Sequence, residues 1–338
     1  MINSFNDFDT LKEVWLGDCY PTDFYYDFDS DVKHAFELIT EITQEDLYKI
    51  QNCLENLGVI VHRPEFTNNR EDYVNDNGFL IKPPIMPRDT DMVLGKEFFH
   101  LRSNYKIDPW KDQIFKFKQN NVVVHEARTN NDLSCIAPPS IVRCGKDLYV
   151  DFDTHEHVWP MVSSTLVEWA KKYRVHINYT GGHSDGVFCL LQEGLIITSC
   201  YKDTYTKTFP GWEIFQLPKE NVQHFQNWWI DDNTVTNNAA FANHINQFAL
   251  DWVGNYTETQ FSVNMLVVDE KTVLSVTDNV QLNEFLDKKG INVIPLDFRA
   301  KSFWDGGLHC LTTDILREGE CKNYFPERTT NNYLEWIE

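Results

Sequence analysis

Apolar residues recur at helical spacing in three parts of the chain, and each time a short turn leads into a β-branched run. In the first part they occupy positions 47, 50, 54 and 57, which predicts a helix with Thr43 as its N-cap. Gly58 then separates this helix from a strand that begins at Val59. The same order returns in "SSTLVEWAKKYRVHINY" and "VQLNEFLDKKGINVIPL", whose strands begin at Val175 and Ile291. Successive strands are thus 116 residues apart, which indicates an internal repeat.

Runs typical of β-hairpins lie between these segments. In "VFCLLQEGLIITS" and in "VNMLVVDEKTVLSV" two apolar strands flank a short polar turn, and "NNVVVHEA" adds a weaker strand within the first interval. A unit of about half the repeat length, holding strands and a helix, fits about five times into the 338 residues. The pattern therefore predicts an α/β fold in which such units form a propeller-like ring. A doubly wound parallel sheet is the alternative, which the hairpins disfavour.

Length and composition favour one folded domain. Hydrophobic residues make up 42% of the chain, which is enough for a large core. No stretch rich in Pro, Gly or Ser separates one part of the chain from another. We therefore expect a single domain over residues 1–338.

The charge excludes some partners. The chain has 51 acidic and 30 basic residues and a net charge of −21, so we expect no nucleic-acid partner, while a cationic small substrate suits this charge. No apolar stretch approaches the roughly 20 residues of a membrane helix, and the N-terminus does not resemble a secretory signal. The eight cysteines form no C-x-x-C pair and are expected to be reduced thiols. We therefore expect a cytoplasmic protein without a membrane partner, and a homodimer is left open.

Three segments combine residue types that carry chemistry. "PRDTDMVLGKEFF" contains Asp89, "YRVHINYTGGHSDGVF" contains His183 and Asp185, and "SFWDGGLHCLTTD" contains Cys310. If the second segment is a strand, His183 and Asp185 point to the same face. A cysteine nucleophile needs a proton-transfer partner, usually a histidine, and a cationic substrate needs carboxylates. These four residues are therefore candidates for a covalent active site, and nearby glycines allow a ligand to approach the backbone.

Each feature also has a simpler structural interpretation. Cysteines are more often buried core residues, a histidine in a glycine-rich loop is often only polar, and an aspartate after Arg88 is a common turn residue. The run "DFDTHEH" would place Asp151, Asp153, His155 and His157 on one face of a strand, where they would suit a metal ion. Alternating polar residues more often form the wet side of a strand. We therefore expect no metal site in this run.

Taken in their order along the chain, these segments resemble the glycine amidinotransferase family of guanidino-group-modifying enzymes. The matching stretches are "PRDTDMVLGKEFF", "YRVHI…GGHSDGVF", "NMLVVDEKTVLSV" and "FWDGGLHCLTTDILREG", and the resemblance extends from Phe8 to Tyr324. It implies a five-bladed α/β-propeller of ββαβ repeats. It also implies a cofactor-free transfer of the amidino group from arginine to an amine acceptor, with glycine as the acceptor in the family.

The resemblance also implies roles for individual residues. The nucleophilic cysteine of the family corresponds to Cys310 and its catalytic histidine to His183. The two aspartates that bind the guanidinium group correspond to Asp89 and Asp185. Lys202 stands where the family has an arginine that holds the donor's carboxylate, and a lysine keeps the charge but not the bidentate geometry.

One position departs from the family pattern. The family has a carboxylate that orients the catalytic histidine, and the matching segment here, "CIAPPSIVRCGKD", has Ala137 at that position. Without this carboxylate the histidine is less well oriented and its protonated form less stabilised. Three functions therefore remain open. They are amidino transfer through an amidino-Cys310 intermediate, hydrolysis of a guanidine as in arginine deiminase-type relatives, and guanidine binding by an inactive pseudoenzyme.

Overall fold

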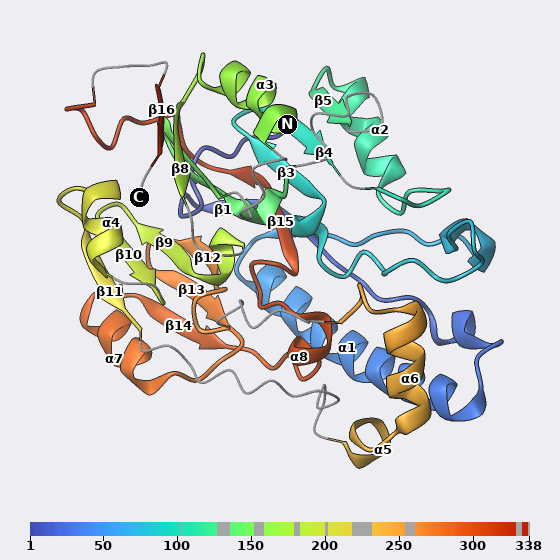
Figure 1. Ribbon diagram of the computed structural model, residues 1–338. Helices are drawn as coiled ribbons and strands as arrows, with labels where there is room; N and C mark the ends of the chain where they lie inside the picture. The colour runs from blue at the N-terminus through green and yellow to red at the C-terminus, as the bar shows by residue number, and fades with distance from the viewer. Residues whose placement is uncertain are drawn as a thin grey trace.

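Short β-branched runs and the tight turns between them give the chain an α/β fold. The computed structural model describes residues 1–101, 103–126, 136–151, 159–178, 183–199, 202–217, 232–253, 261–328 and 333–336. Within these residues the strands form five small sheets (Figure 1). Four sheets have three strands and one has four, so no single large sheet runs through this part of the chain.

Each sheet is built from one ββαβ unit. An antiparallel hairpin comes first, a helix follows, and a third strand pairs in parallel with the second strand of the hairpin. In chain order, four units are β3 (Asp91–Leu94), β4 (Glu97–His100), α2 (Lys111–Gln119) and β5 (Val123–Glu126); β6 (Ile141–Cys144), β7 (Asp147–Asp151), α3 (Trp159–Trp169) and β8 (Arg174–Asn178); β9 (Phe188–Gln192), β10 (Leu195–Thr198), α4 (Lys202–Thr208) and β11 (Glu213–Gln216); and β12 (Leu266–Asp269), β13 (Thr272–Ser275), α7 (Val280–Lys288) and β14 (Asn292–Pro295).

The fifth unit joins the two ends of the chain. Strand β15 (Thr312–Arg317) pairs antiparallel with β1 (Leu11–Leu16), and β1 pairs in parallel with β2 (Ile60–His62) after helix α1 (Ser30–Asn56). Figure 1 shows the red β15 beside the blue β1. A further strand, β16 (Tyr333–Trp336), adds to the edge of β8. The predicted ββαβ repeat and the predicted hairpins are present, whereas the closure of the sheets into a five-bladed ring stays a prediction.

The hairpin turns explain why the repeat is visible in the sequence. Gly95 and Gly145 connect the hairpin strands of two units with φ values of +62° and +63°, which side chains disfavour. At Gly145 a Cβ atom would also lie 2.0 Å from the backbone oxygen of Lys322. These mixed sheets do not match the doubly wound parallel sheet that the sequence left as an alternative.

Helix α1 is longer than the sequence pattern indicated. It starts at Ser30, so the prediction that Thr43 caps its N-terminus is wrong. Thr43 is buried inside the helix, donates its hydroxyl hydrogen to the backbone oxygen of Ile39 at 2.6 Å and accepts a hydrogen bond from Trp304 Nε1 at 2.9 Å. A threonine hydroxyl that bonds four residues back in this way fits a helix interior as well as a cap. The apolar spacing simply continues upstream of Thr43, for example at Ile39.

The remaining helices lie to one side of the sheets. Helix α6 (Ala239–Phe248) packs against α1, and Figure 1 shows α5 (Asn233–Thr236) and α8 (Lys301–Trp304) in the same part of the molecule. Short 3₁₀ turns complete the described elements: η1 (Thr22–Tyr25), η2 (Arg70–Tyr73), η3 (Pro87–Asp89), η5 (Pro138–Ser140) and η6 (Ser184–Gly186).

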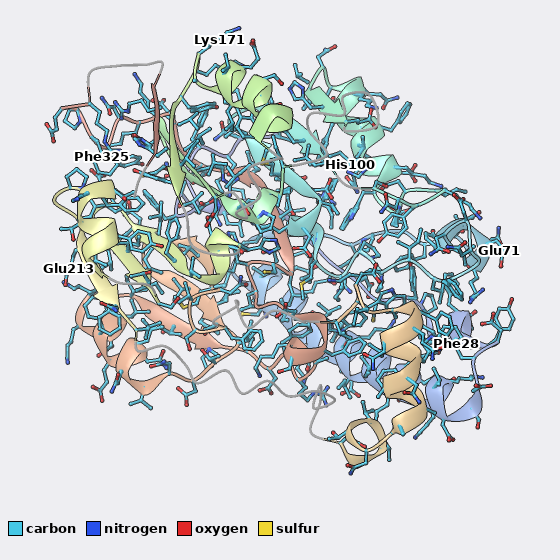
Figure 2. The ribbon with its side chains drawn as sticks, in the orientation of Figure 1. Phe28, Glu71, His100, Lys171, Glu213 and Phe325 are labelled. Carbon is cyan, nitrogen blue, oxygen red and sulfur yellow. The ribbon has the colours of Figure 1, made fainter. Side chains whose placement is uncertain are left out.

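Charged side chains lie both on the outside of the molecule and in its interior. Figure 2 shows Glu71, Lys171 and Glu213 at the outer edge, whereas His100 lies inside. The six cysteines within the described residues are free thiols, as the sequence predicts. Among the described helices, none has the length and apolar character needed to cross a membrane.

Candidate active site

The candidate residues occupy the same place in successive units. Asp89 lies two residues before β3, Ala137 four before β6, Asp185 three before β9 and Cys310 two before β15. In the remaining unit, Asn264 lies two residues before β12. The start of the first strand in every unit is therefore a common location for these side chains, although the four sequence segments are far apart along the chain.

Three of these segments are single 3₁₀ turns that pack against one another. The turn η3 contacts η5, and η5 contacts η6. Proline begins both η3 and η5, where its fixed φ suits the first helical residue. The Ser184 hydroxyl of η6 donates a hydrogen bond to the backbone oxygen of Ser140 in η5 at 3.4 Å. The segments that bear Asp89, Ala137 and Asp185 are thus brought together.

Cys310 is a buried thiol in contact with a carboxylate. The residue is 3% exposed, and its Sγ donates to Asp185 Oδ2 at a distance of 3.4 Å. Burial, followed by the negative charges of Asp185 and Asp89, raises the pKa of the thiol well above its usual value. Because burial and these nearby carboxylates disfavour the thiolate, Cys310 stays protonated at neutral pH.

Asn264 holds both the backbone and the sulfur of Cys310. Its Oδ1 accepts hydrogen bonds from the backbone N–H groups of Gly307 and Cys310, each at 3.1 Å. Its Nδ2 donates to Cys310 Sγ at 3.0 Å and to the backbone oxygen of Asp185 at 3.1 Å. A side chain at position 307 would not fit, since a Cβ atom there would lie 2.5 Å from the Asn264 backbone oxygen. The glycine therefore permits this close contact.

Asp185 is ionised and keeps one oxygen available. Its Oδ2 accepts a hydrogen bond from His309 Nδ1 at 2.7 Å, whereas its Oδ1 is buried and has no hydrogen-bond partner among the described residues. Burial alone would raise the pKa of Asp185, but the hydrogen bond and charge of His309, with the charges of His183 and Arg88, lower it below its usual value. A buried carboxylate oxygen without a partner is uncommon and suits an N–H group of a ligand.

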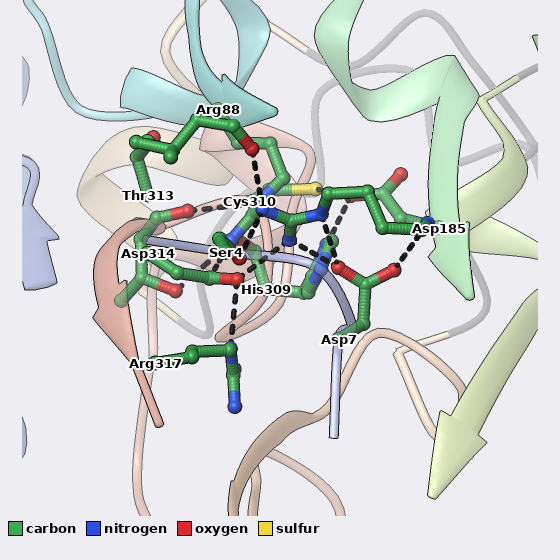
Figure 3. Close-up of polar contacts among 12 residues, drawn as sticks. Ser4, Asp7, Arg88, Asp185, His309, Cys310, Thr313, Asp314 and Arg317 are labelled. Carbon is green, nitrogen blue, oxygen red and sulfur yellow. Dashed lines mark hydrogen bonds and ion pairs between the residues drawn. The ribbon is translucent and has the colours of Figure 1, made fainter. Parts of the chain in front are cut away.

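A buried ionic network lies next to the cysteine (Figure 3). Asp314 accepts from Arg143 at 2.6 Å, from Arg317 at 2.8 Å and from Arg88, and Arg143 also pairs with Asp7. Burial opposes the charge of Asp314, but the three arginines hold its pKa well below the usual value. Three cations and two anions leave this cluster with a net positive charge.

Arg88 connects the segment that carries Asp89 to the segment that carries Cys310. It is buried, and its Nε donates to the backbone oxygens of His309 at 3.1 Å and Thr312 at 2.9 Å. These residues flank Cys310, while Asp89 follows Arg88 directly in η3. The guanidinium group of Arg88 therefore fixes the distance between the segment of Asp89 and the segment of Cys310.

Asp89 lies beside a cavity of about 120 Å³ whose lining includes Lys82 and His100. Lys82 Nζ is 3.9 Å from the Asp89 carboxylate, which is 33% exposed. Asp89 is one of the two carboxylates whose negative charge raises the pKa of Cys310. Asp89 and Asp185 thus both act on the sulfur, from different units of the fold.

His183 lies next to this arrangement, but not on a strand. Ser184–Gly186 forms the 3₁₀ turn η6, so the expectation that His183 and Asp185 share one face of a strand is wrong. The physical reason is the sequence Ser-Asp-Gly, whose residues favour turns. His183 is half-buried, and its charge acts on Asp185. Within the described residues, no carboxylate is hydrogen-bonded to His183, and Ala137 is half-buried at the start of η5.

Several predicted features lie outside the described residues. Lys202 is the first residue of α4, but its side chain is among the parts not described. Gly181, Gly182 and the run of residues 152–158 are also outside the described ranges. Within those ranges, no group of three or more His, Cys, Asp or Glu side chains has an arrangement that could hold a metal ion.

Three residues of the site were not identified from the sequence. His309 is next to Cys310 in the segment "GGLHC", but nothing in that pattern indicates its bond to Asp185. Asn264 could have been found by aligning the units, because it occupies the position of Asp89 and Cys310 relative to the first strand. Arg88 stands beside Asp89, but its bonds to the backbone near Cys310 depend on contacts that only the fold creates.

No protein-family model matches the chain. Among curated proteins, its relatives include the mitochondrial glycine amidinotransferase of Xenopus laevis, which is 21% identical over 345 residues that cover 87% of this chain and 72% of the relative. They also include the L-arginine:L-lysine amidinotransferase of Pseudomonas savastanoi pv. phaseolicola, which is 20% identical and matches 95% of this chain and 96% of its own length.

Solved structures with a similar fold include amidinotransferases and DDAH. The amidinotransferase SxtG of saxitoxin biosynthesis from Microseira wollei has a TM-score of 0.68 at 16% identity, and the inosamine-phosphate amidinotransferase StrB1 of Streptomyces griseus has 0.64 at 18%. Both matches cover 96% of this chain and 99% of the other chain. DDAH from Pseudomonas aeruginosa, in complex with citrulline, has 0.52 at 12% identity and covers 91% of this chain and 100% of its own.

Proposed function

We propose, from the similarity to amidinotransferases, that this protein moves the amidino group of L-arginine or a similar guanidine donor to an amine acceptor such as glycine. One observation carries this proposal. A buried thiol, Cys310, touches the carboxylate of Asp185, whose second oxygen is buried and has no hydrogen-bond partner in the described part of the chain. The charge of a second carboxylate, Asp89, also acts on the sulfur. Two carboxylates beside a nucleophile suit a planar cation whose central carbon is to be attacked.

The donor's guanidinium group binds between Asp89 and Asp185. Each carboxylate accepts N–H hydrogen bonds from the cation, and a charge-assisted bond of this type contributes roughly 1.5–3 kcal/mol. The cation gives Asp185 Oδ1 the hydrogen-bond partner that it lacks among the described residues. The cation also offsets the two negative charges that keep Cys310 protonated, so donor binding lowers the pKa of the thiol.

The chemistry then proceeds in two halves. His183 takes the proton of the Cys310 thiol as the sulfur bonds to the guanidinium carbon. His183 then gives a proton to Nε of arginine, and the C–N bond breaks to release ornithine and leave amidino-Cys310. Neutral His183 then takes a proton from the incoming amine. The nitrogen of the amine bonds to the amidino carbon, the C–S bond breaks, and Cys310 is released as the thiolate. In this proposal Lys202 holds the donor's carboxylate, and no cofactor takes part.

Hydrolysis is the second candidate function. The structural likeness to DDAH, an enzyme seen with citrulline, favours it. In this reaction Cys310 would attack the guanidinium carbon with loss of ammonia instead of ornithine, and water would then attack the carbon held on the sulfur and release citrulline. The higher TM-scores of the two amidinotransferases and the names of the sequence relatives support transfer instead. The alanine at position 137 keeps an inactive, guanidine-binding protein as the third candidate.

Incubation with arginine and a panel of amines, followed by mass spectrometry, tests the proposal. Transfer yields ornithine and a new guanidine compound, hydrolysis yields citrulline and ammonia, and a binding protein yields neither. With arginine and no acceptor, we expect an amidino adduct on the Cys310 peptide. An absence of both the adduct and any product would contradict transfer and hydrolysis alike.

The proposal also covers how the five ββαβ units are arranged around the active site. We infer that the five units close into a single five-bladed propeller, with the active site where the units meet. The pairing of β15 with β1 across the two ends of the chain supports this, as do the contacts that link η3, η5 and η6 and then Asp185, Asn264, Cys310 and Arg88. The free state of the described cysteines agrees with a cytoplasmic location.

A further inference from the structure

We propose that Asn264 is a further catalytic residue, which donates a hydrogen bond to the Cys310 thiolate and thereby both generates and aims the nucleophile. The inference rests on the proposed role of Cys310. Asn264 is fully buried, and its Nδ2 lies 3.0 Å from the sulfur. A residue that donates directly to the reacting atom acts on the reaction and not on the fold alone.

The orientation of the Asn264 amide is fixed by its other bonds. Its oxygen accepts two backbone N–H groups, from Gly307 and Cys310, and neither can bond to an NH₂ group. The nitrogen must therefore face the sulfur and the backbone oxygen of Asp185, which accepts its other hydrogen at 3.1 Å. A donor held in place before the reaction costs no reorganisation when negative charge appears on the sulfur.

The surroundings of the sulfur make such a donor necessary. The two nearby carboxylates, Asp89 and Asp185, disfavour the thiolate, and the Asp185 contact is one in which the thiol itself donates. Among the described residues, Asn264 alone donates a hydrogen bond to Cys310 Sγ. When the thiol loses its proton, the Asp185 contact loses its hydrogen while the Asn264 bond strengthens, because its acceptor becomes charged.

Asn264 also couples the nucleophile to the binding of the cation. One NH₂ group contacts both Cys310 Sγ and the backbone of Asp185, which carries the carboxylate proposed to bind guanidinium. The distance between nucleophile and carboxylate is thus set by one planar amide. In the β12 unit Asn264 occupies the place that Asp89 and Cys310 occupy in theirs, so this unit also contributes a side chain to the site.

The test is the rate at which iodoacetamide alkylates Cys310, followed on the Cys310 peptide by mass spectrometry across a range of pH. Below the ionisation midpoint this rate is proportional to the fraction of thiolate. We expect Asn264→Ala to slow alkylation by about 10- to 100-fold at each such pH, the loss of one hydrogen bond to a charged group. Asn264→Asp should slow it more, because it keeps the backbone acceptor but turns a carboxylate toward the sulfur.

Asn279→Ala is the matched control. Asn279 belongs to the same unit and caps helix α7 by accepting from the backbone N–H of Leu282 at 3.1 Å, so its loss lowers stability without touching the sulfur. We expect its alkylation rate to equal that of the wild type. Alkylation of folded Asn264 variants at the wild-type rate overturns the proposal.

A second measurement uses the wild-type chain and covers the case in which Asn264 variants fail to fold. The side-chain amide of Asn264, in protein labelled with ¹⁵N-asparagine, should shift between neutral and alkaline pH in step with the alkylation rate, and should not shift in Cys310→Ser. An amide resonance that ignores pH overturns the proposal. Neither readout involves arginine, so slower alkylation without any arginine adduct would refute the proposed function while leaving the role of Asn264 intact.

Discussion

Two histidine–aspartate pairs in this molecule differ in how completely the aspartate oxygens are bonded. In the first, His309 donates to one oxygen of Asp185, and the other oxygen has no partner among the described residues. In the second, His100 lies between Asp91 and Asp108, at 2.6 and 2.9 Å. The second oxygen of Asp91 is also bonded, to the Thr90 hydroxyl at 2.5 Å. One pair is saturated and the other is not.

The difference separates a structural cluster from a chemical one. In a saturated buried cluster, hydrogen bonds and ion pairs within the protein offset the burial of the charges, and no polar atom remains to bind a ligand. Burial alone would lower the pKa of His100, but Asp91 and Asp108 raise it to about 10, so the ring is charged and holds β3 and β4 near Asp89. The second oxygen of Asp185 makes no bond that stabilises the fold within the described residues, and its carboxylate contacts Cys310. Substitutions in the two clusters should therefore have opposite effects on activity and stability.

The largest effect is expected from the nucleophile. Cys310→Ser should reduce turnover of arginine by at least about 1,000-fold with the fold intact, since a hydroxyl lacks the acidity and nucleophilicity of a thiol. Cys144→Ser is the control, because Cys144 is a fully buried thiol in β6 outside the site, and this variant should lose stability but retain turnover. Steady-state kinetics and thermal unfolding distinguish the two. Retained turnover in Cys310→Ser would exclude a covalent mechanism.

The next effect comes from the two carboxylates at the sulfur. Asp185→Asn should lower kcat/KM for arginine by about 10- to 100-fold, because it removes a charge-assisted bond to the guanidinium group. Asp89→Asn should have a smaller effect, since Asp89 is 33% exposed and water screens its charge. In the saturated cluster, Asp91→Asn should instead lower the free energy of unfolding by about 3 kcal/mol, the cost of breaking a buried ion pair. Equal kinetic losses at Asp185 and Asp91 would refute the comparison.

The saturated cluster also predicts how stability depends on pH. The pKa of His100 is raised to about 10 in the folded protein, so its stabilising charge is fully present below the unfolded value of about 6.5. This contribution, roughly 5 kcal/mol at most, should be lost as pH rises through the folded value. Thermal unfolding should therefore show a Tm that falls between these two pH values, and His100→Gln should be less stable but have a flatter profile. An equal slope in both proteins would show that His100 does not carry the effect.

The sequence predicted most of what is local and little of what is long-range. The hairpins, the repeat and the segments of Asp89, Asp185 and Cys310 follow from spacing, turn residues and family motifs. The extent of α1 was underestimated, because Thr43 looks like a cap in isolation and becomes an interior residue once Trp304 packs on it. The roles of Asn264 and Arg88 depend on bonds between segments that lie 46 and more than 200 residues apart, and no local pattern encodes such bonds.

The smallest effect is expected at Ala137, where a substitution should act specifically on proton transfer by His183. This residue directly precedes η5, which packs against η6, the turn that follows His183. Within the described residues, no carboxylate is bonded to His183. Ser140 is the nearby polar side chain, but a hydroxyl can orient a ring without stabilising its positive charge. Ala137→Asp should therefore raise kcat by about 10-fold or less with little change in the KM for arginine, because the gain arises in proton transfer and not in binding. Ala137→Asn, which has nearly the same size but no charge, should gain less, and the difference should appear in the pH profile of kcat. If Ala137→Asp lowers kcat while the protein stays folded, His183 already has what it needs, and the alanine is a compatible part of a complete site.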